Sequence, residues 1–290
     1  MESLKSTETN SMAKGVTIVS GLWDLSIDGR DFNEHYLARF DEFLQIPCNM
    51  VLFVPKSLEE FIWERRSQDN TFIKFYELDD IKNNMFAPFW DQWQSIRTNP
   101  DWISQAGWLA NSPQGSKEYY FPIQCCKMFF MHDAKIWNHF DSEYFLWMDA
   151  GLTNTVDKNL FYKKENFERI TNYIDPFLFI SYPYQASNEI HGFKFEDMNR
   201  YSGETVKYVC RGGLFGCHRD FLSEAHGQYY GLLERSLSEG LGGADECLFT
   251  ILSYLNPEYY RRFAIDGNGL VSKFMHAVDA NGVELEKAKL

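Results

Sequence analysis

The sequence lacks the signatures of several large protein classes. None of its six cysteines forms a Cys-x-x-Cys pair, so zinc-site spacing is absent and buried, reduced thiols are expected. No stretch approaches the roughly 20 apolar residues of a membrane-spanning helix, and the polar N-terminus has no signal-peptide core. Neither Gly-x-Ser-x-Gly nor His-Glu-x-x-His occurs, which disfavours a serine hydrolase or a zincin. We therefore expect a cytoplasmic protein with no transmembrane segment.

Positive charge is also scarce, since 28 Lys and Arg residues stand against 41 Asp and Glu residues, a net charge of −13. General nucleic-acid binders gain most of their affinity by neutralising phosphates, so this balance does not favour a DNA partner. Aromatic residues are abundant, at 17%, and the apolar content of 44% predicts a sizeable core. We expect a disordered leader at residues 1–13 and one domain at residues 14–290.

Strands and helices alternate in the first 80 residues. Short apolar or β-branched runs predict strands at Val16–Ser20, Asn49–Val54 and Phe72–Tyr76. Helical spacing predicts a helix at Phe32–Leu44, and Ser57 is a good start for another. This alternation argues for a right-handed parallel sheet that binds a nucleotide-like ligand.

The rest of the chain predicts further elements of the same α/β fold. The Trp-rich region Phe86–Gln114 is broken by three prolines and fits irregular helices or a lid. The other patterns predict helices at Tyr120–Asn138, from Arg219 and at Glu246–Leu255, and strands at Glu143–Met148 and Phe177–Tyr182. The expected fold class is a single domain with a central, mostly parallel sheet flanked by helices.

The most informative stretch is Glu143–Thr153, which reads E-Y-F-L-W-M-D-A-G-L-T. Its apolar run suits a buried strand that ends at Asp149, and Gly151 lets the backbone approach a ligand closely. In open α/β sheets, ligands bind beyond the carboxyl ends of the strands, so Asp149 is placed to meet a nucleotide, a metal or a sugar. The alternative is an Asp that only ends a strand and begins a turn.

Charged residues near glycines provide two further candidate sites. Asp24 and Arg30 follow the first strand, and a guanidinium group can form paired hydrogen bonds to phosphate oxygens. Asp245 and Glu246 follow a glycine-rich segment where a helix begins. There they either stabilise the helix start or supply a general base for an acceptor hydroxyl.

Two other features have both a structural and a functional interpretation. The segment Arg211–Gly216, R-G-G-L-F-G, has neither the P-loop ending nor Gly-x-Gly-x-x-Gly spacing. It is expected to form a turn or a flexible floor beneath a sugar. His276 is either a structural residue or a ligand of a divalent metal.

Four motifs occur in an order that resembles the HtrL/YibB-like family: V-T-I-V-S-G-L-W-D-L, F-L-W-M-D-A-G-L, G-G-L-F-G and G-A-D-E-C-L-F. The resemblance spans about Lys14 to Ala277. That family resembles glycosyltransferases of the GT-A fold, which implies a GT-A-like (Rossmann-like) domain that transfers a sugar from a nucleotide-sugar donor. A UDP-sugar, an inverting reaction and an acceptor hydroxyl on a surface glycan or on a modified nucleobase of phage DNA are expected. The alternatives are a non-catalytic nucleotide- or sugar-binding protein and a nucleotidyltransferase.

The resemblance also implies roles for individual residues. Asp149 matches the first carboxylate of an Asp-x-Asp segment that meets the donor ribose and a divalent ion, whereas Gly151 replaces the usual metal ligand. Mn²⁺ or Mg²⁺ held by Asp149 and His276 is therefore expected to help without being indispensable. Asp245 or Glu246 is the expected catalytic base, with Asp245 favoured. The expected donor-binding residues are Trp23, Asp24, Arg30, Asp149, Gly151, Gly212 and Gly213.

Overall fold

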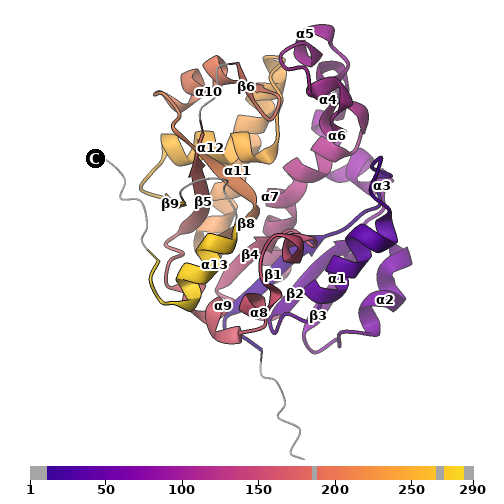
Figure 1. Cartoon of the computed structure of the whole chain (residues 1–290), viewed down its shortest axis with the longest axis vertical. Helices are drawn as coiled ribbons and strands as arrows, with labels where there is room; N and C mark the ends of the chain where they lie inside the picture. Colours follow the sequence, from indigo (N-terminus) through magenta and orange to yellow (C-terminus); the bar gives the residue numbers. More distant parts are fainter. Residues whose placement is uncertain (1–11, 185–187, 266–270, 284–290) are drawn as a thin grey trace, which may run out of the picture.

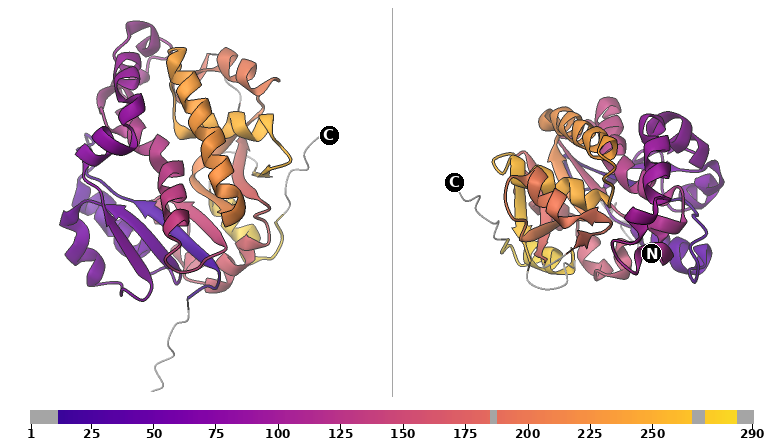
Figure 2. Two further views of the ribbon diagram at one scale, coloured as in Figure 1. Left: turned by 180° about the vertical axis from the view of Figure 1, so that it is seen from behind. Right: turned by 90° about the horizontal axis from the view of Figure 1, so that it is seen from above.

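A seven-stranded sheet forms the centre of the computed structural model, with helices α7 and α11 on one face and α1 and α13 on the other (Figures 1 and 2). The structure describes residues 12–184, 188–265 and 271–283. The strands, in the order in which they lie in the sheet, are β3 Thr71–Phe75, β2 Asn49–Val54, β1 Val16–Gly21, β4 Tyr144–Met148, β8 Tyr208–His218, β5 Phe177–Pro183 and β9 Tyr260–Ala264.

The helices differ greatly in length, from single turns to α7 and α11. The α-helices are α1 Ala38–Phe43, α2 Glu59–Trp63, α3 Leu78–Asp80, α4 Trp90–Arg97, α5 Pro100–Ile103, α6 Pro113–Ser116, α7 Tyr120–Trp137, α8 Lys158–Phe161, α9 Lys164–Thr171, α10 Phe195–Ser202, α11 Arg219–Ser238, α12 Asp245–Leu255 and α13 Val271–Asp279. A π-helical segment, Phe32–Leu37, leads into α1, so the predicted helix at Phe32–Leu44 is confirmed with an irregular first half.

The order in which successive strands are added to the sheet reverses next to β1. This strand pairs in parallel with β2 on one side and with β4 on the other, and β2 pairs in parallel with β3. The chain thus moves outward from β1 to β3 and returns to β4 across the starting strand. Such a switch point opens a crevice at the carboxyl ends of the strands, where α/β proteins bind ligands. Trp23 and Asp149 lie just beyond the ends of β1 and β4.

Most elements expected from the sequence are present, and the predicted fold class is confirmed. The strand at Asn49–Val54 has the predicted bounds, and helices α7, α11 and α12 begin within one residue of the predicted positions. The Trp-rich region folds into short helices whose Trp93 and Trp102 are buried. The expectation for the leader mostly concerns residues 1–11, which lie outside the described residues. Ala13, the last residue of the predicted leader, is instead part of the folded structure: it is buried, and its amide donates a hydrogen bond to the carbonyl of Pro47 (2.8 Å).

The predicted turn at Arg211–Gly216 is wrong, because this segment lies within β8. The alternative expectation, a floor beneath a sugar, stays a prediction. Strand β8 runs antiparallel to both β4 and β5. The glycines that suggested a loop instead let neighbouring side chains approach the strand: a Cβ on Gly216 would lie 2.5 Å from Leu146. Strand β9 and the two-stranded hairpin of β6 Glu189–Ile190 and β7 Phe193–Lys194 were not predicted.

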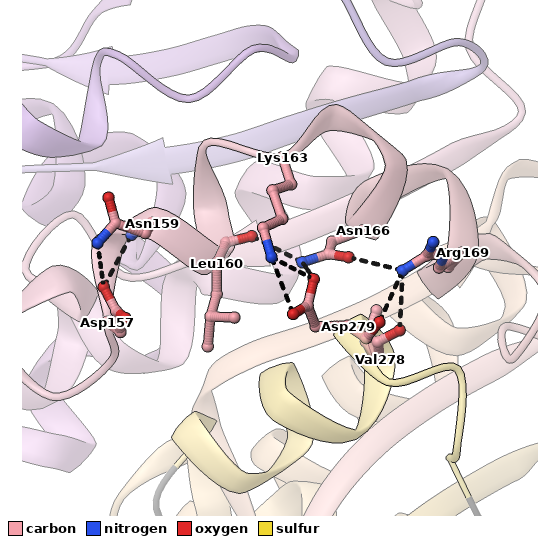
Figure 3. A network of polar contacts seen from close by, with 8 residues as sticks. All are labelled: Asp157, Asn159, Leu160, Lys163, Asn166, Arg169, Val278 and Asp279. Carbon is pink, nitrogen blue, oxygen red and sulfur yellow. Dashed lines mark hydrogen bonds and ion pairs between the residues drawn. The ribbon is translucent and has the colours of Figure 1, made fainter.

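Polar contacts around Asp279, the last residue of α13, hold this helix to α9 and to Lys163, the residue that precedes α9 (Figure 3). Lys163 pairs with the Asp279 carboxylate (2.8 Å), and Asn166 donates an amide hydrogen to the same group (3.2 Å). Arg169 donates to the Asp279 carbonyl (2.9 Å). These contacts fix the orientation of the helix that carries His276. Within the described ranges, no helix has the length and apolar content needed to span a membrane.

Candidate active site

A cavity of about 560 Å³ lies at the switch point of the sheet. Its wall combines the segments after β1 and β4, the middle of β8, the start of α12 and one face of α7. The charged and aromatic residues that line it are Trp23, Arg30, His35, Tyr36, Arg39, Tyr120, Lys127, Trp147, Asp149, His191, Arg211, Asp245 and Glu246. The cavity therefore brings together residues from both halves of the chain.

Asp149 enters this cavity directly from the end of β4. Its backbone N–H donates to the carbonyl of Gly213 on β8 (2.9 Å), which fixes the main chain at this point. Its side chain accepts a hydrogen bond from the Trp147 indole N–H at Oδ1 (2.7 Å) and is 43% exposed. The predicted position of Asp149, beside a ligand-sized cavity, is therefore present in the structure.

Lys127, on the buried side of α7, joins two carboxylates that are far apart in the sequence. Its Nζ lies 3.0 Å from Asp149 Oδ1 and 3.1 Å from Asp245 Oδ2, and it donates to the Gly212 carbonyl (3.0 Å). The ammonium group thus forms hydrogen bonds with Asp149 and Gly212 and an ion pair with Asp245. Burial disfavours the charged form, but the carboxylates of Asp149 and Asp245 outweigh it and raise the pKa of Lys127 above its ordinary value.

Asp245 is the first residue of α12 and is almost completely buried, although it lines the cavity. Burial raises the pKa of this carboxyl group to about 6, and the nearby charge of Lys127 opposes the shift. The carboxylate lies against the backbone of Gly212, where a Cβ would be 2.3 Å from Asp245 Oδ2. A glycine at this place in β8 is thus needed for the observed position of Asp245.

Glu246 has a different set of partners from its neighbour. It accepts a hydrogen bond from the Gly212 N–H at Oε1 (3.0 Å), and His191 Nε2 lies 3.1 Å from Oε2. Arg211 Nη1 lies 3.5 Å from Oε1. Burial opposes ionisation, yet the hydrogen bond from His191, the charge of Arg211 and the Gly212 N–H together lower the pKa of Glu246 to about 2. Glu246 is therefore ionised, and it is held in place by His191 and by two residues of β8.

His191 reaches the cavity from the tip of the β6–β7 hairpin. Ile190 pairs with Phe193, so His191 and Gly192 form the two-residue turn, with φ of 48° and 90°. Such a turn requires positive φ at both central residues, a conformation that is uncommon for residues other than glycine. The carbonyl of His191 accepts from the N–H of Ala244, which joins the hairpin to the start of α12. Although burial lowers it, the pKa of His191 is raised on balance by Glu246.

The other end of the cavity carries aromatic and basic residues. Trp23 is buried, stacks on Phe130 and donates its indole N–H to the Tyr76 carbonyl (2.8 Å). Arg30 donates to the Tyr36 hydroxyl (3.2 Å) and is largely exposed. Arg39 and His35 line the same end. This arrangement can hold an aromatic base and a phosphate group.

The structure brings most of the predicted site residues together, with three exceptions. Trp23, Arg30, Asp149, Gly151, Gly213, Asp245 and Glu246 line the cavity. Asp24 is exposed, and its Oδ1 accepts a hydrogen bond from the Ser26 N–H (2.7 Å). Gly212 lies behind Asp245 and does not line the cavity. His276 is exposed on α13. His276 therefore does not reach the cavity beside Asp149, its predicted partner in binding a metal.

Asp149 has no second protein ligand for a divalent metal ion beside it. Mg²⁺ is usually bound by one or two carboxylates together with phosphate oxygens and water, and no group of three or more His, Cys, Asp and Glu residues suited to a metal occurs in the part of the chain that the structure describes. Asp149 Oδ1 is already engaged by Trp147 and Lys127. Gly151, in the place of a second carboxylate, offers no side chain.

Three residues that pair with Asp245 or Glu246 had no predicted role: Lys127, His191 and Arg211. Lys127 had one recognisable signal, since it is a charged residue within the apolar run C-C-K-M-F-F of a predicted helix. Arg211 lay in the segment that was interpreted as a turn. His191 had no signal in the sequence, because strands β6 and β7 have only two residues each.

No protein-family model matches the chain, and no curated protein does so either. The structure is similar to core-mannan synthase A from Aspergillus fumigatus in its Mn/GDP form, with 11% identity, a TM-score of 0.50, and 90% of this chain and 74% of that chain covered. It is also similar to the mannosyltransferase Ktr4p from S. cerevisiae in complex with GDP, with 10% identity, a TM-score of 0.49, and 86% and 69% covered. A third similar structure is mouse xyloside xylosyltransferase 1, with 10% identity to this chain, a TM-score of 0.45, and 84% of this chain and 83% of that chain covered.

The fold is GT-A-like, as the sequence predicted. At identities this low the similarity concerns the fold alone, so the resemblance to the HtrL/YibB-like family stays a prediction. The residues in the cavity provide the basis for assigning a function.

Proposed function

We propose that this protein is a glycosyltransferase that moves a sugar from a nucleotide-sugar donor to an acceptor hydroxyl group. The observation that carries the proposal is the common cavity of Asp149, Asp245 and Glu246 at the switch point of a GT-A-like sheet. Asp149 comes from the donor side of the sheet, at the end of β4, and the acidic pair comes from the start of α12. A sugar bound in the cavity against these residues would have Asp149 near its donor phosphate and the acidic pair near its acceptor.

The nucleotide is proposed to occupy the end of the cavity at Trp23 and Arg30. The Trp23 ring supplies an apolar surface for the base and ribose, and Arg30 and Arg39 offer donors to the diphosphate. From the family resemblance we expect a UDP-sugar. Asp24 is left out of this assignment, since its carboxylate faces the Ser26 amide.

Asp245 is proposed to act as the base of an inverting transfer. Its pKa of about 6 leaves it ionised at neutral pH while making it a better proton acceptor than Glu246, whose pKa is about 2. The acceptor oxygen forms a bond to the anomeric carbon as the bond from that carbon to the diphosphate oxygen breaks. The acceptor proton passes to Asp245, and the electron pair of the broken bond leaves with the diphosphate.

The acceptor is proposed to be a glycan hydroxyl, on a surface glycan for example. A modified nucleobase in phage DNA contains a suitable hydroxyl too, but the net charge of −13 opposes approach of a polyanion.

A thermal-shift screen of nucleoside diphosphates and nucleotide sugars tests the proposal. A ligand present at 100 times its Kd should stabilise the fold by about 2.7 kcal/mol. We expect one nucleotide sugar and its diphosphate to raise the Tm, and the sugar to be released slowly when no acceptor is present. Binding without any release or transfer of sugar would indicate a non-catalytic binding protein. Consumption of a sugar phosphate and a nucleoside triphosphate would indicate a nucleotidyltransferase.

A further inference from the structure

Lys127 places a buried positive charge in the wall of the cavity, next to two carboxylates. Its side chain is 8% exposed, and its ammonium group lies within 3.1 Å of one oxygen each from Asp149 and Asp245. A lysine this buried loses hydration that only strong partners can replace. The two carboxylates and the Gly212 carbonyl provide that replacement, so the cation has a fixed place in the wall of the cavity.

A metal ion bound at Asp149 would compete with this lysine. Asp149 Oδ1 accepts the Trp147 indole N–H (2.7 Å) and lies 3.0 Å from Lys127 Nζ, while Oδ2 lies 3.4 Å from the same Nζ. Both carboxylate oxygens therefore face the ammonium group. A divalent ion on either oxygen would lie close to the ammonium group, and it would compete with Lys127 for Asp149 and leave the lysine with only Asp245 and the Gly212 carbonyl as partners.

Other cations lie on the path that a diphosphate would take. Arg30 lines the cavity and is held by the Tyr36 hydroxyl (3.2 Å). Arg39 lines it as well, with a side chain that is 40% exposed and paired with Glu42 (3.1 Å). Guanidinium groups bind phosphate oxygens through two parallel hydrogen bonds, so this end of the cavity can neutralise phosphate with side chains alone.

We propose that Lys127 is the resident cation of this site and that the cavity binds a nucleoside diphosphate without a divalent metal ion. The proposal rests on the function proposed above. In that reaction, Lys127 supplies a fixed positive charge beside Asp149, where the leaving diphosphate gains negative charge as its bond to the sugar breaks. Lys127 also holds Asp245 in place, so a single side chain couples the donor side of the cavity to its acceptor side.

Isothermal titration of the wild-type protein with UDP, GDP, ADP, CDP and TDP, in EDTA and in Mn²⁺, tests this directly. We expect one diphosphate to bind with a Kd that differs by less than threefold between the two conditions. Mn²⁺ titration followed by electron paramagnetic resonance should show no tight binding to the protein alone. A Kd at least tenfold lower in Mn²⁺ would refute the role of Lys127 and leave the proposed function standing. Absence of binding by all five diphosphates in both conditions would refute the proposed function itself.

Lys127→Met gives a second readout that a purely structural lysine would not change. The substitution leaves Asp149 and Asp245 without their shared cation, so the diphosphate Kd should rise at least tenfold in EDTA. Mn²⁺ should then restore part of the affinity and bind to the free variant, since two carboxylates have become available. Loss of affinity that Mn²⁺ does not restore, with Tm unchanged, would contradict the assignment.

Lys135→Met is the matched control for this variant. Lys135 lies two turns further along α7 and donates to the Ser223 hydroxyl (2.9 Å), away from the cavity. Its diphosphate Kd should stay within twofold of the wild-type value in both conditions. If Lys127→Met does not fold, the comparison of wild-type Kd values in EDTA and Mn²⁺ decides the question alone.

Discussion

His191 Nε2 lies 3.1 Å from Glu246 Oε2, so the tip of the β6–β7 hairpin is tied to the first turn of α12. The same carboxylate accepts the Gly212 N–H from β8 (3.0 Å). Glu246 therefore joins the β6–β7 hairpin, β8 and α12 at the cavity. These contacts hold the site together, and they agree with the proposal that Asp245, not Glu246, accepts the proton.

Glu246→Gln should lower stability in a pH-dependent way. The pKa of Glu246 falls from its ordinary 4.5 to about 2 on folding, so the ionised group stabilises the fold fully above pH 4.5. That contribution is lost as the pH falls from 4.5 to 2, and it amounts to roughly 3 kcal/mol at most. Urea unfolding should thus show a large difference between wild type and variant at pH 7 and a smaller one at pH 3. An equal difference at both pH values would show that the charge of Glu246 is not what stabilises the fold.

Asp149→Asn should lower transfer at least about 100-fold, which corresponds to about 2.7 kcal/mol of transition-state stabilisation. The fold should stay intact, because the amide oxygen of the introduced asparagine can still accept from the Trp147 indole N–H. Steady-state rates and the Tm of the variant check both parts. Turnover within tenfold of wild type would show that Asp149 does not face the donor.

The pH dependence of kcat/KM should show one acidic limb near pH 6. Below that pH Asp245 becomes protonated and can no longer accept the acceptor proton, so the rate should fall about tenfold per pH unit. Because the negative charge of Glu246 raises the pKa of Asp245, Glu246→Gln should move the limb to lower pH. If the limb stays at the same pH in this variant, the group that titrates is neither Asp245 nor Glu246.

Gly212→Ala should displace Asp245 and lower transfer at least tenfold. A Cβ at position 212 would lie 2.3 Å from Asp245 Oδ2 and 2.9 Å from its Cγ, so the carboxylate would have to leave its place beside Lys127. Gly227→Ala is the control, since a Cβ there meets nothing within 4 Å in the middle of α11. The control should keep wild-type activity and a Tm at least as high. Full activity in Gly212→Ala would mean that the position of Asp245 is unimportant.

The sequence was sufficient for the parts of the fold that depend on local patterns. The apolar run before Asp149 predicted β4, and the glycine-rich start before Asp245 predicted α12. Arg211–Gly216 was misjudged because glycines there serve side-chain packing within a strand, which only the neighbouring elements reveal. Strand β9 was missed because two of its five residues are arginines.

The site was predictable where its residues follow strands and not where they come from other elements. Asp149 and Arg30 were found from their positions after strands. Lys127 depends on the register of α7 against the sheet, and His191 on a short hairpin whose turn is stabilised by tertiary contacts. Neither is determined by local sequence. His276 was expected near Asp149 by analogy alone, and the contacts that orient α13 leave it exposed.

Proton NMR of the anomeric signal, recorded while the best-binding nucleotide sugar is incubated with wild type and with Asp245→Asn, tests the central claim most directly. We predict that the wild-type protein releases or transfers the sugar with inversion at the anomeric carbon. The Asp245→Asn variant should bind the donor within a few fold of wild type and turn it over at least about 100 times more slowly, because a general base acts mainly in the transition state. Retention of configuration, or more than a tenth of wild-type turnover by the variant, would contradict the account.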